Sequence, residues 1–150
     1  MIPVETADVL TGLATHLYNV GLGRYSTSTY TEDPTKPGIF FIEMKDAPNT
    51  AVALTVYMWD RTRDSHNPDV YVQLRIRAAP GSNLAVDRLA DRFAADLHWA
   101  DDHPPEVWAF GSRKMHVLNS IQVVRTQPVK DSNNRWERFD SYRITFNPGE

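Results

Sequence analysis

The sequence predicts an α+β fold in which a mainly antiparallel sheet is packed by two helices. Residues 6–20 and 82–98 repeat apolar side chains at three- and four-residue steps, which is helical spacing. Residues 70–77 alternate apolar and polar side chains, which is typical of a strand with one face in water. The order helix, strands, helix, strands is that of an α+β protein.

The first helix carries one apolar stripe and has a defined end. Gly21 and Gly23 follow it and favour termination, because glycine accepts the backbone conformation that closes a helix. The stripe consists of Val9, Leu10, Leu13, Leu17 and Val20. Residues 24–38 are rich in Ser, Thr, Tyr, Pro and Gly, and we expect a loop or a short edge strand there.

Three strands are predicted next, at residues 39–44, 50–59 and 70–77. The segment 61–69 between the last two is too long and too charged for a tight hairpin turn. We therefore expect it to form a mobile surface arm.

The second half begins with the helix at 82–98 and a loop at 101–105. A short strand is expected at 107–110, followed by a final hairpin whose strands span 115–125 and 136–146. Its connection contains Pro128 and the turn-forming run Asp131-Ser-Asn-Asn.

Composition limits the class of protein. The 150 residues predict one domain, 1–150, and the absence of cysteine excludes a disulfide scaffold, a thiolate zinc site and a cysteine nucleophile. The formal charge of −3 is unlike that of proteins that wrap nucleic acid. With no apolar run near the length of a membrane span and no signal peptide, we expect a soluble, intracellular protein without a membrane partner.

Two segments gather side chains that could ligate a metal or transfer protons. Residues 98–103 contain two histidines and two aspartates, and the arm region contains Asp60, Asp64, His66 and Asp69. Neither has the ligand spacing of a known zinc or calcium site. We therefore expect no catalytic residue, cofactor or bound metal, and a small metal-dependent enzyme that uses these two segments remains the alternative.

Other residues favour an interface between subunits. Gln73, Arg75 and Arg77 form a donor-rich row on the polar face of the strand at 70–77. Arginines covered by another element need carboxylate partners. The second helix offers Asp87, Asp91 and Asp96, either within the chain or on a neighbouring copy. Arg61 and Arg63 of the arm and Trp136 at the mouth of the hairpin are further candidates, since aromatic and arginine side chains are common interface anchors.

In the order of its predicted helices and strands and in its sequence, the chain resembles the minor capsid and tail-terminator proteins of long-tailed bacteriophages. The resemblance covers most of the chain. It depends on residues 70–77 (VYVQLRIR) with the helix at 84–97, on the closing hairpin from Val123 to Phe146, and on the opening helix that ends in VGLG. In the family a glycine often precedes the hairpin arginine, whereas here Asn134 precedes Arg135, and both residue types accept left-handed turn geometry.

The resemblance implies a structural virion protein without catalysis. Such proteins form a ring, typically of six copies, that caps the head-proximal end of the tail tube and docks to the head–tail connector. The implied partners are other copies of the chain, the major tail tube protein and the connector or stopper protein. Phage DNA would pass through the lumen without specific binding, which a mildly acidic ring allows. The implied location is the virion neck, after synthesis in the bacterial cytoplasm.

Two alternatives stay open beside the metal enzyme. One is a stopper or head-completion protein on the connector side of the same joint. The other is a bacterial binding module for an unidentified ligand.

Overall fold

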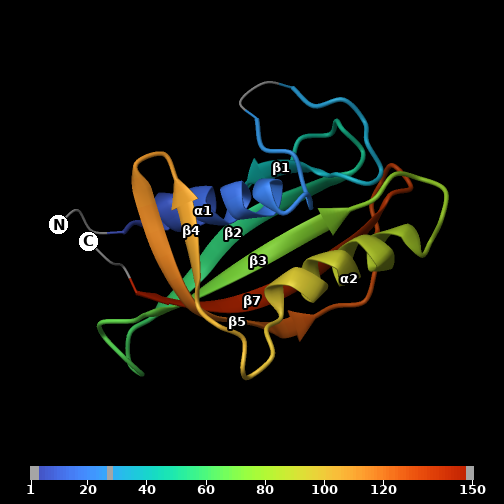
Figure 1. Cartoon of the computed structure of the whole chain (residues 1–150). Helices are drawn as coiled ribbons and strands as arrows, with labels where there is room; N and C mark the ends of the chain where they lie inside the picture. The colour runs from blue at the N-terminus through green and yellow to red at the C-terminus, as the bar shows by residue number, and fades with distance from the viewer. Residues whose placement is uncertain (1–3, 27–28, 148–150) are drawn as a thin grey trace.

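The computed structural model describes residues 4–26 and 29–147. Two helices and seven strands follow one another along the chain (Figure 1). In order they are α1 (Thr6–Asn19), β1 (Gly38–Phe41), β2 (Ala51–Asp60), β3 (Asp69–Arg77), α2 (Ala85–Leu97), β4 (Glu106–Phe110), β5 (Arg113–Arg125), β6 (Val129–Lys130) and β7 (Trp136–Asn147). The predicted α+β class, both helices and the closing β5–β7 hairpin are confirmed.

The strands form one sheet in the order β1-β2-β3-β7-β5-β4, with β6 paired to β7. The sheet is mixed, because β1 runs parallel to β2 whereas the remaining pairs are antiparallel. The expectation of a mainly antiparallel sheet is therefore corrected. Parallel neighbours need a connection that returns the chain to the same end of the sheet. Residues 42–50 make this return, and side-chain periodicity carries no information about strand direction.

Both helices pack on one face of the sheet. In β3 the predicted alternation is confirmed, since Val70, Val72, Leu74 and Ile76 are fully buried against the helices. The buried helix residues that complete this core include Val9, Leu13, Leu17, Leu89, Phe93 and Leu97. The helices also contact each other, because His16 of α1 lies 2.7 Å from the Asp96 carboxylate of α2. Within the described ranges, no helix covers the opposite face of the sheet.

Most strand ends agree with the predicted ranges to within two residues, and β1 is the exception. It ends at Phe41 instead of residue 44, because Ile42 has a positive φ of 65° that a strand cannot continue through. Of the segment 24–37, residues 24–26 and 29–37 are described, and they contribute a single bridge, between Arg24 and Gly38, with no helix or strand of their own. At the tip of the closing hairpin Asn134 has a φ of 62°, the left-handed geometry expected there.

A buried charged cluster joins α2 to the sheet. Arg138 of β7 is 2% exposed and lies on the helix-covered face, where it bonds Asp140 on its own strand and Asp87 of α2. Burial lowers the pKa of the Arg138 guanidinium, and hydrogen bonds to Asp140 and Asp87 more than offset this, so the net shift is upward. The cluster replaces apolar packing at the N-terminal end of α2.

Neither helix in the described ranges is both long and apolar enough to cross a membrane.

Candidate interaction surface

The core does not use the helix-free face of the sheet. We call it the open face, and its central residues alternate with the core residues of β3 and β7. They are Tyr71, Gln73 and Arg75 of β3 and Phe139, Ser141 and Arg143 of β7. Register places Tyr71 opposite Arg143, Gln73 opposite Ser141, and Arg75 opposite Phe139. The face therefore presents arginine, tyrosine and amide groups together.

A β-bulge in β2 enlarges this face. The pairing with β3 shifts between Val56 and Met58, so Tyr57 and Met58 together oppose Tyr71. Both are exposed, at 51% and 44%, and the Tyr57 and Tyr71 rings lie 6.0 Å apart. Tyr57 keeps the alternation of Thr55, whereas Met58 is turned away from the core by the bulge.

The predicted donor row divides into residues of different character. Gln73 is half-buried in the middle of the open face. Arg75 is also half-buried and donates from Nη2 to both carboxylate oxygens of Glu137, at 3.1 and 2.9 Å. Its Nε is buried without an acceptor among the described residues. Arg75 thus retains donor capacity that this chain does not satisfy.

Arg77 has a structural role. It is 2% exposed, and its Nε and Nη2 donate to the backbone carbonyls of Lys45, Asp46, Pro48 and Asn49. Burial lowers the pKa of this guanidinium. Its donors hold the 42–50 segment against the sheet, so the Arg77 side chain forms one boundary of the open face.

The acidic residues of α2 do not meet this row within the chain, because α2 covers the other face of the sheet. Asp87 bonds Arg138, and Asp91 bonds Arg125. Asp96 bonds His16. The arginines of the donor row and the aspartates of α2 therefore lie on opposite sides of the sheet, and each aspartate has another partner.

The 61–68 arm forms the second boundary of the open face. Arg63 donates from Nε and Nη2 to the two oxygens of Asp69, each at 3.0 Å, and Thr145 also donates to Asp69. Burial raises the pKa of Asp69, but the bonds from Arg63 and Thr145 outweigh it, and the pKa lies below its usual value. Arg61 lies over the Trp59 ring at 5.0 Å. The arm is thus fixed at its base, and Figure 1 shows that it projects beyond the sheet at lower left.

Trp136 stands where β6 joins β7. Its ring is half-buried, and the Lys130 ammonium lies 5.5 Å from its centre. The adjoining tip is rigid because Arg135 binds Asp131 and Asp46, at 2.8 Å each. Burial raises the pKa of Asp131. Hydrogen bonds from Arg135 and from the Asn133 backbone outweigh this effect, so the pKa lies below its usual value.

The two segments considered for metal binding do not converge on a site. Asp60 and Asp64 accept hydrogen bonds from their own loop. His103 bonds Glu106 at 2.8 Å and stacks on Trp99. Within residues 4–26 and 29–147, no group of three or more His, Asp or Glu side chains is placed to hold a metal ion.

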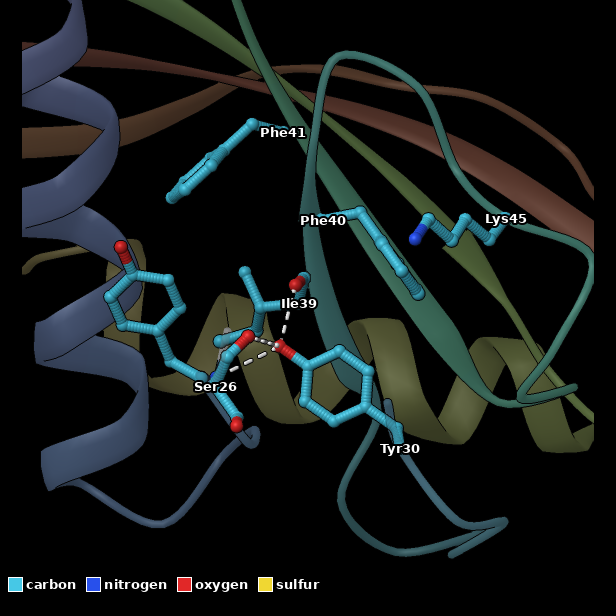
Figure 2. Close-up of a pocket in the computed structure, with 7 residues that line it drawn as sticks. Ser26, Tyr30, Ile39, Phe40, Phe41 and Lys45 are labelled. Atoms are coloured by element: carbon cyan, nitrogen blue, oxygen red, sulfur yellow. Dashed lines mark hydrogen bonds between the residues drawn. The ribbon is translucent and has the colours of Figure 1, made fainter. Parts of the chain in front are cut away.

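A pocket of about 350 Å³ opens at the outer edge of β1. Figure 2 shows Phe40 and Phe41 on opposite sides of the strand, with the Tyr30 hydroxyl directed at Ser26 and Ile39. That hydroxyl lies 2.9 Å from the Ile39 carbonyl and accepts the Ser26 N–H at 3.0 Å. Lys45 contributes a positive charge, and Tyr25 completes the lining. The walls are therefore mainly aromatic, with one cation.

Sequence reasoning missed three contributors to these surfaces. Arg143 extends the donor row onto β7, and alternation along 136–146 was the available signal. Met58 reaches the open face only through a bulge, because regular alternation would place it with Leu54 and Val56 on the core side, and no pattern in the sequence indicates the bulge. The pocket joins a loop to an edge strand, and only the folded chain brings these together.

Neither the known family models nor the curated proteins contain a match to this chain.

Proposed function

We propose that this protein is a structural subunit of a bacteriophage head–tail joint, a tail terminator that forms a ring on the head-proximal end of the tail tube. The resemblance in sequence supports this assignment. The structural observation that supports it most is that helices cover only one face of the described sheet. Two helices cover one face of the sheet, while the other presents Arg75, Arg143 and Tyr71 between two fixed boundaries.

This architecture suits a ring subunit for a physical reason. A closed ring of identical subunits needs two different complementary patches on each copy. Surfaces that bind other proteins are enriched in tyrosine and arginine relative to the rest of a protein surface. The open face provides one such patch, and the helix layer on the far side leaves room for a different one. The proposed location is accordingly the virion neck.

Light scattering across a range of concentrations, with and without purified tail-tube protein, tests the proposal. Six copies of the 17.1 kDa chain would give a species of about 103 kDa. A monomer that joins only to tube ends also agrees with a terminator whose ring is templated by the tube. A monomer that ignores tubes but binds portal-bearing heads would instead favour the stopper assignment. Binding to neither would contradict both.

The edge pocket favours one second candidate, a binding module for a small aromatic anion. Four aromatic rings offer stacking surfaces, and Lys45 offers a charge for an anionic group. Anilinonaphthalene sulfonate combines both features and fluoresces when it leaves water. Saturable binding that weakens in Lys45→Ala, together with no assembly and no tube binding, would favour this candidate over the terminator.

A further inference from the structure

The open face contains arginine donors that find no partner among the described residues. Arg143 is half-buried, and no hydrogen bond or ion pair joins it to another residue in the part of the chain that the structure describes. It interacts electrostatically with Asp69, but both oxygens of that carboxylate are already bonded by Arg63. Arg75, whose side chain is 39% exposed, bonds Glu137 through Nη2 and leaves Nη1 without an acceptor in the same described region. Half-buried arginines with spare donors favour a partner that supplies carboxylates.

Aromatic rings frame these donors. Tyr57 is half exposed beside Tyr71, and the Arg75 guanidinium lies 5.9 Å from the Phe139 ring centre. Arginine and tyrosine together are the residue types that dominate interface hot spots. The partner of this face is therefore a protein surface with at least one exposed acidic group.

The same chain carries such a surface in the turn that follows α2. Asp101 and Asp102 are adjacent and exposed, and neither pairs with any residue in the described ranges. The turn has a fixed shape, because the His103 N–H donates to the Ala100 carbonyl at 3.0 Å and the His103 ring stacks on buried Trp99. Two carboxylates are thus held in a defined position without a partner.

The two patches lie on different parts of the molecule. The turn joins α2 to β4, at the end of the helix layer, whereas the open face lies on the other side of the sheet (Figure 1). The Asp101–Asp102 turn can therefore contact an open face only on a second copy of the chain. Pairs of unlike patches generate rings or filaments, in contrast to a twofold dimer.

We propose that the Asp101–Asp102 turn of one subunit docks on the open face of the next, where its carboxylates bind Arg143 and the free edge of Arg75. This inference rests on the proposed function, since it assumes that the protein assembles with itself. It names the partner of the open face, and it makes the contact head-to-tail.

Charge reversal tests the pairing on the full chain. Arg143→Glu is the suitable variant on the open face, because Arg143 has no direct ion pair within the described residues and the neighbouring Asp69 keeps both of its bonds from Arg63. Arg75→Glu is unsuitable, since Glu137 is 7% exposed and would face a second carboxylate. Asp101→Lys with Asp102→Lys reverses the turn. We expect each variant to keep the wild-type circular dichroism spectrum and to require at least a tenfold higher concentration to assemble, alone or on tube ends.

Mixing the two variants gives the decisive result. The Arg143→Glu open face is complementary to the lysine turn, and the unchanged open face of the lysine variant is complementary to the unchanged acidic turn. A 1:1 mixture should therefore recover assembly as an alternating ring with an even number of subunits, which six copies satisfy. Light scattering measures the recovered mass, and differently tagged variants show that both are present.

Two matched controls reverse charges outside the proposed contact. Arg88→Glu on α2 and Glu43→Lys on the 42–50 segment both alter exposed side chains, and assembly should stay at the wild-type level. Wild-type assembly in the Arg143 or aspartate variants overturns the pairing and leaves the ring proposal intact. Loss in each variant without recovery in the mixture also overturns it, because each charge then serves another partner. A wild-type chain that neither assembles nor binds tubes overturns the proposed function itself.

Discussion

Arg138 and Asp140, two residues apart on β7, form a buried ion pair in which Nη2 lies 2.6 Å and Nε 2.9 Å from the carboxylate oxygens. Asp140 is fully buried and Arg138 is 2% exposed. Because Arg138 also bonds Asp87, this pair determines where the first turn of α2 contacts the sheet.

Removing one member of the pair should destabilise the subunit strongly. We expect Arg138→Met to lower the free energy of unfolding by about 3–5 kcal/mol, because it leaves the Asp140 carboxylate buried without its cation. Urea denaturation measures the loss. Arg138→Met combined with Asp140→Leu should recover much of it, since no fully buried charge is left unpaired and the remaining Asp87 carboxylate is 38% exposed to water.

Arg125→Met is the control for that experiment. Arg125 is half exposed and pairs with Asp91 at the surface, so its loss should cost less than about 1 kcal/mol. Equal losses in Arg138→Met and Arg125→Met would contradict the assignment of a buried, structural pair.

Arg77 should be irreplaceable even by lysine. An ammonium cannot reproduce donors that reach four carbonyls of the 42–50 segment, so Arg77→Lys should cost at least about 2 kcal/mol in urea denaturation. Limited proteolysis should also cleave the released segment faster. Arg75→Lys, two residues earlier on the same face, should stay within about 1 kcal/mol of wild type. Similar losses in both variants would show that the carbonyl contacts of Arg77 contribute little.

Stability should fall in acid because of Asp69. Its folded-state pKa lies below its usual value of 3.8, so folding favours the charged carboxylate. The resulting stability is complete above about pH 5, and it is lost as the pH falls through 4 towards the lowered folded-state value. Asp69→Asn should therefore destabilise the protein at pH 7 and much less at pH 3, as measured by the urea midpoint. Glu43→Gln, at an exposed side chain outside the proposed contact, should change the urea midpoint little at either pH, and a pH-independent loss for Asp69→Asn would refute the linkage.

Gly38 is required by the close approach of Tyr30. A Cβ at this position would lie 2.6 Å from the Tyr30 ring, so Gly38→Ala should cost about 1–3 kcal/mol and displace the ring from the edge pocket. Tyr30→Ala removes the obstruction. In a double-mutant cycle the combined variant should therefore lose less stability than the sum of the two single variants. Simple additivity would mean that the ring moves aside without cost.

Local pattern was sufficient for much of this fold. The apolar stripes of α1 and α2 and the alternation in β3 predict those elements, because each stripe must be buried by something. The same reasoning could not find the parallel β1–β2 pair, since strand direction depends on the path of residues 42–50. Arg77 holds that path in place. The alternation of residues 70–77 suggests that Arg77 makes a subunit contact, but its guanidinium donates to backbone carbonyls of the 42–50 segment instead.

The candidate surface divides in the same way. Gln73 and Arg75 could be placed on the polar face from alternation alone. Arg143 joins them only because β7 pairs with β3 in a register that places Arg143 opposite Tyr71. Strand pairing also decides which arginines have a carboxylate partner. Arg75 bonds Glu137, which lies 62 residues later in the sequence.

The sequence by itself determined the α+β class, the position of both helices, the polar face of β3 and the absence of any thiol chemistry. These depend on the spacing and identity of neighbouring residues, which the chain carries before it folds. Tertiary structure decided the mixed sheet, the one-sided cover by both helices and the absence of a partner for Arg143 within residues 4–26 and 29–147. Each of those depends on contacts between residues far apart in the chain, and such contacts are selected by the packing of the whole core and not by any local pattern.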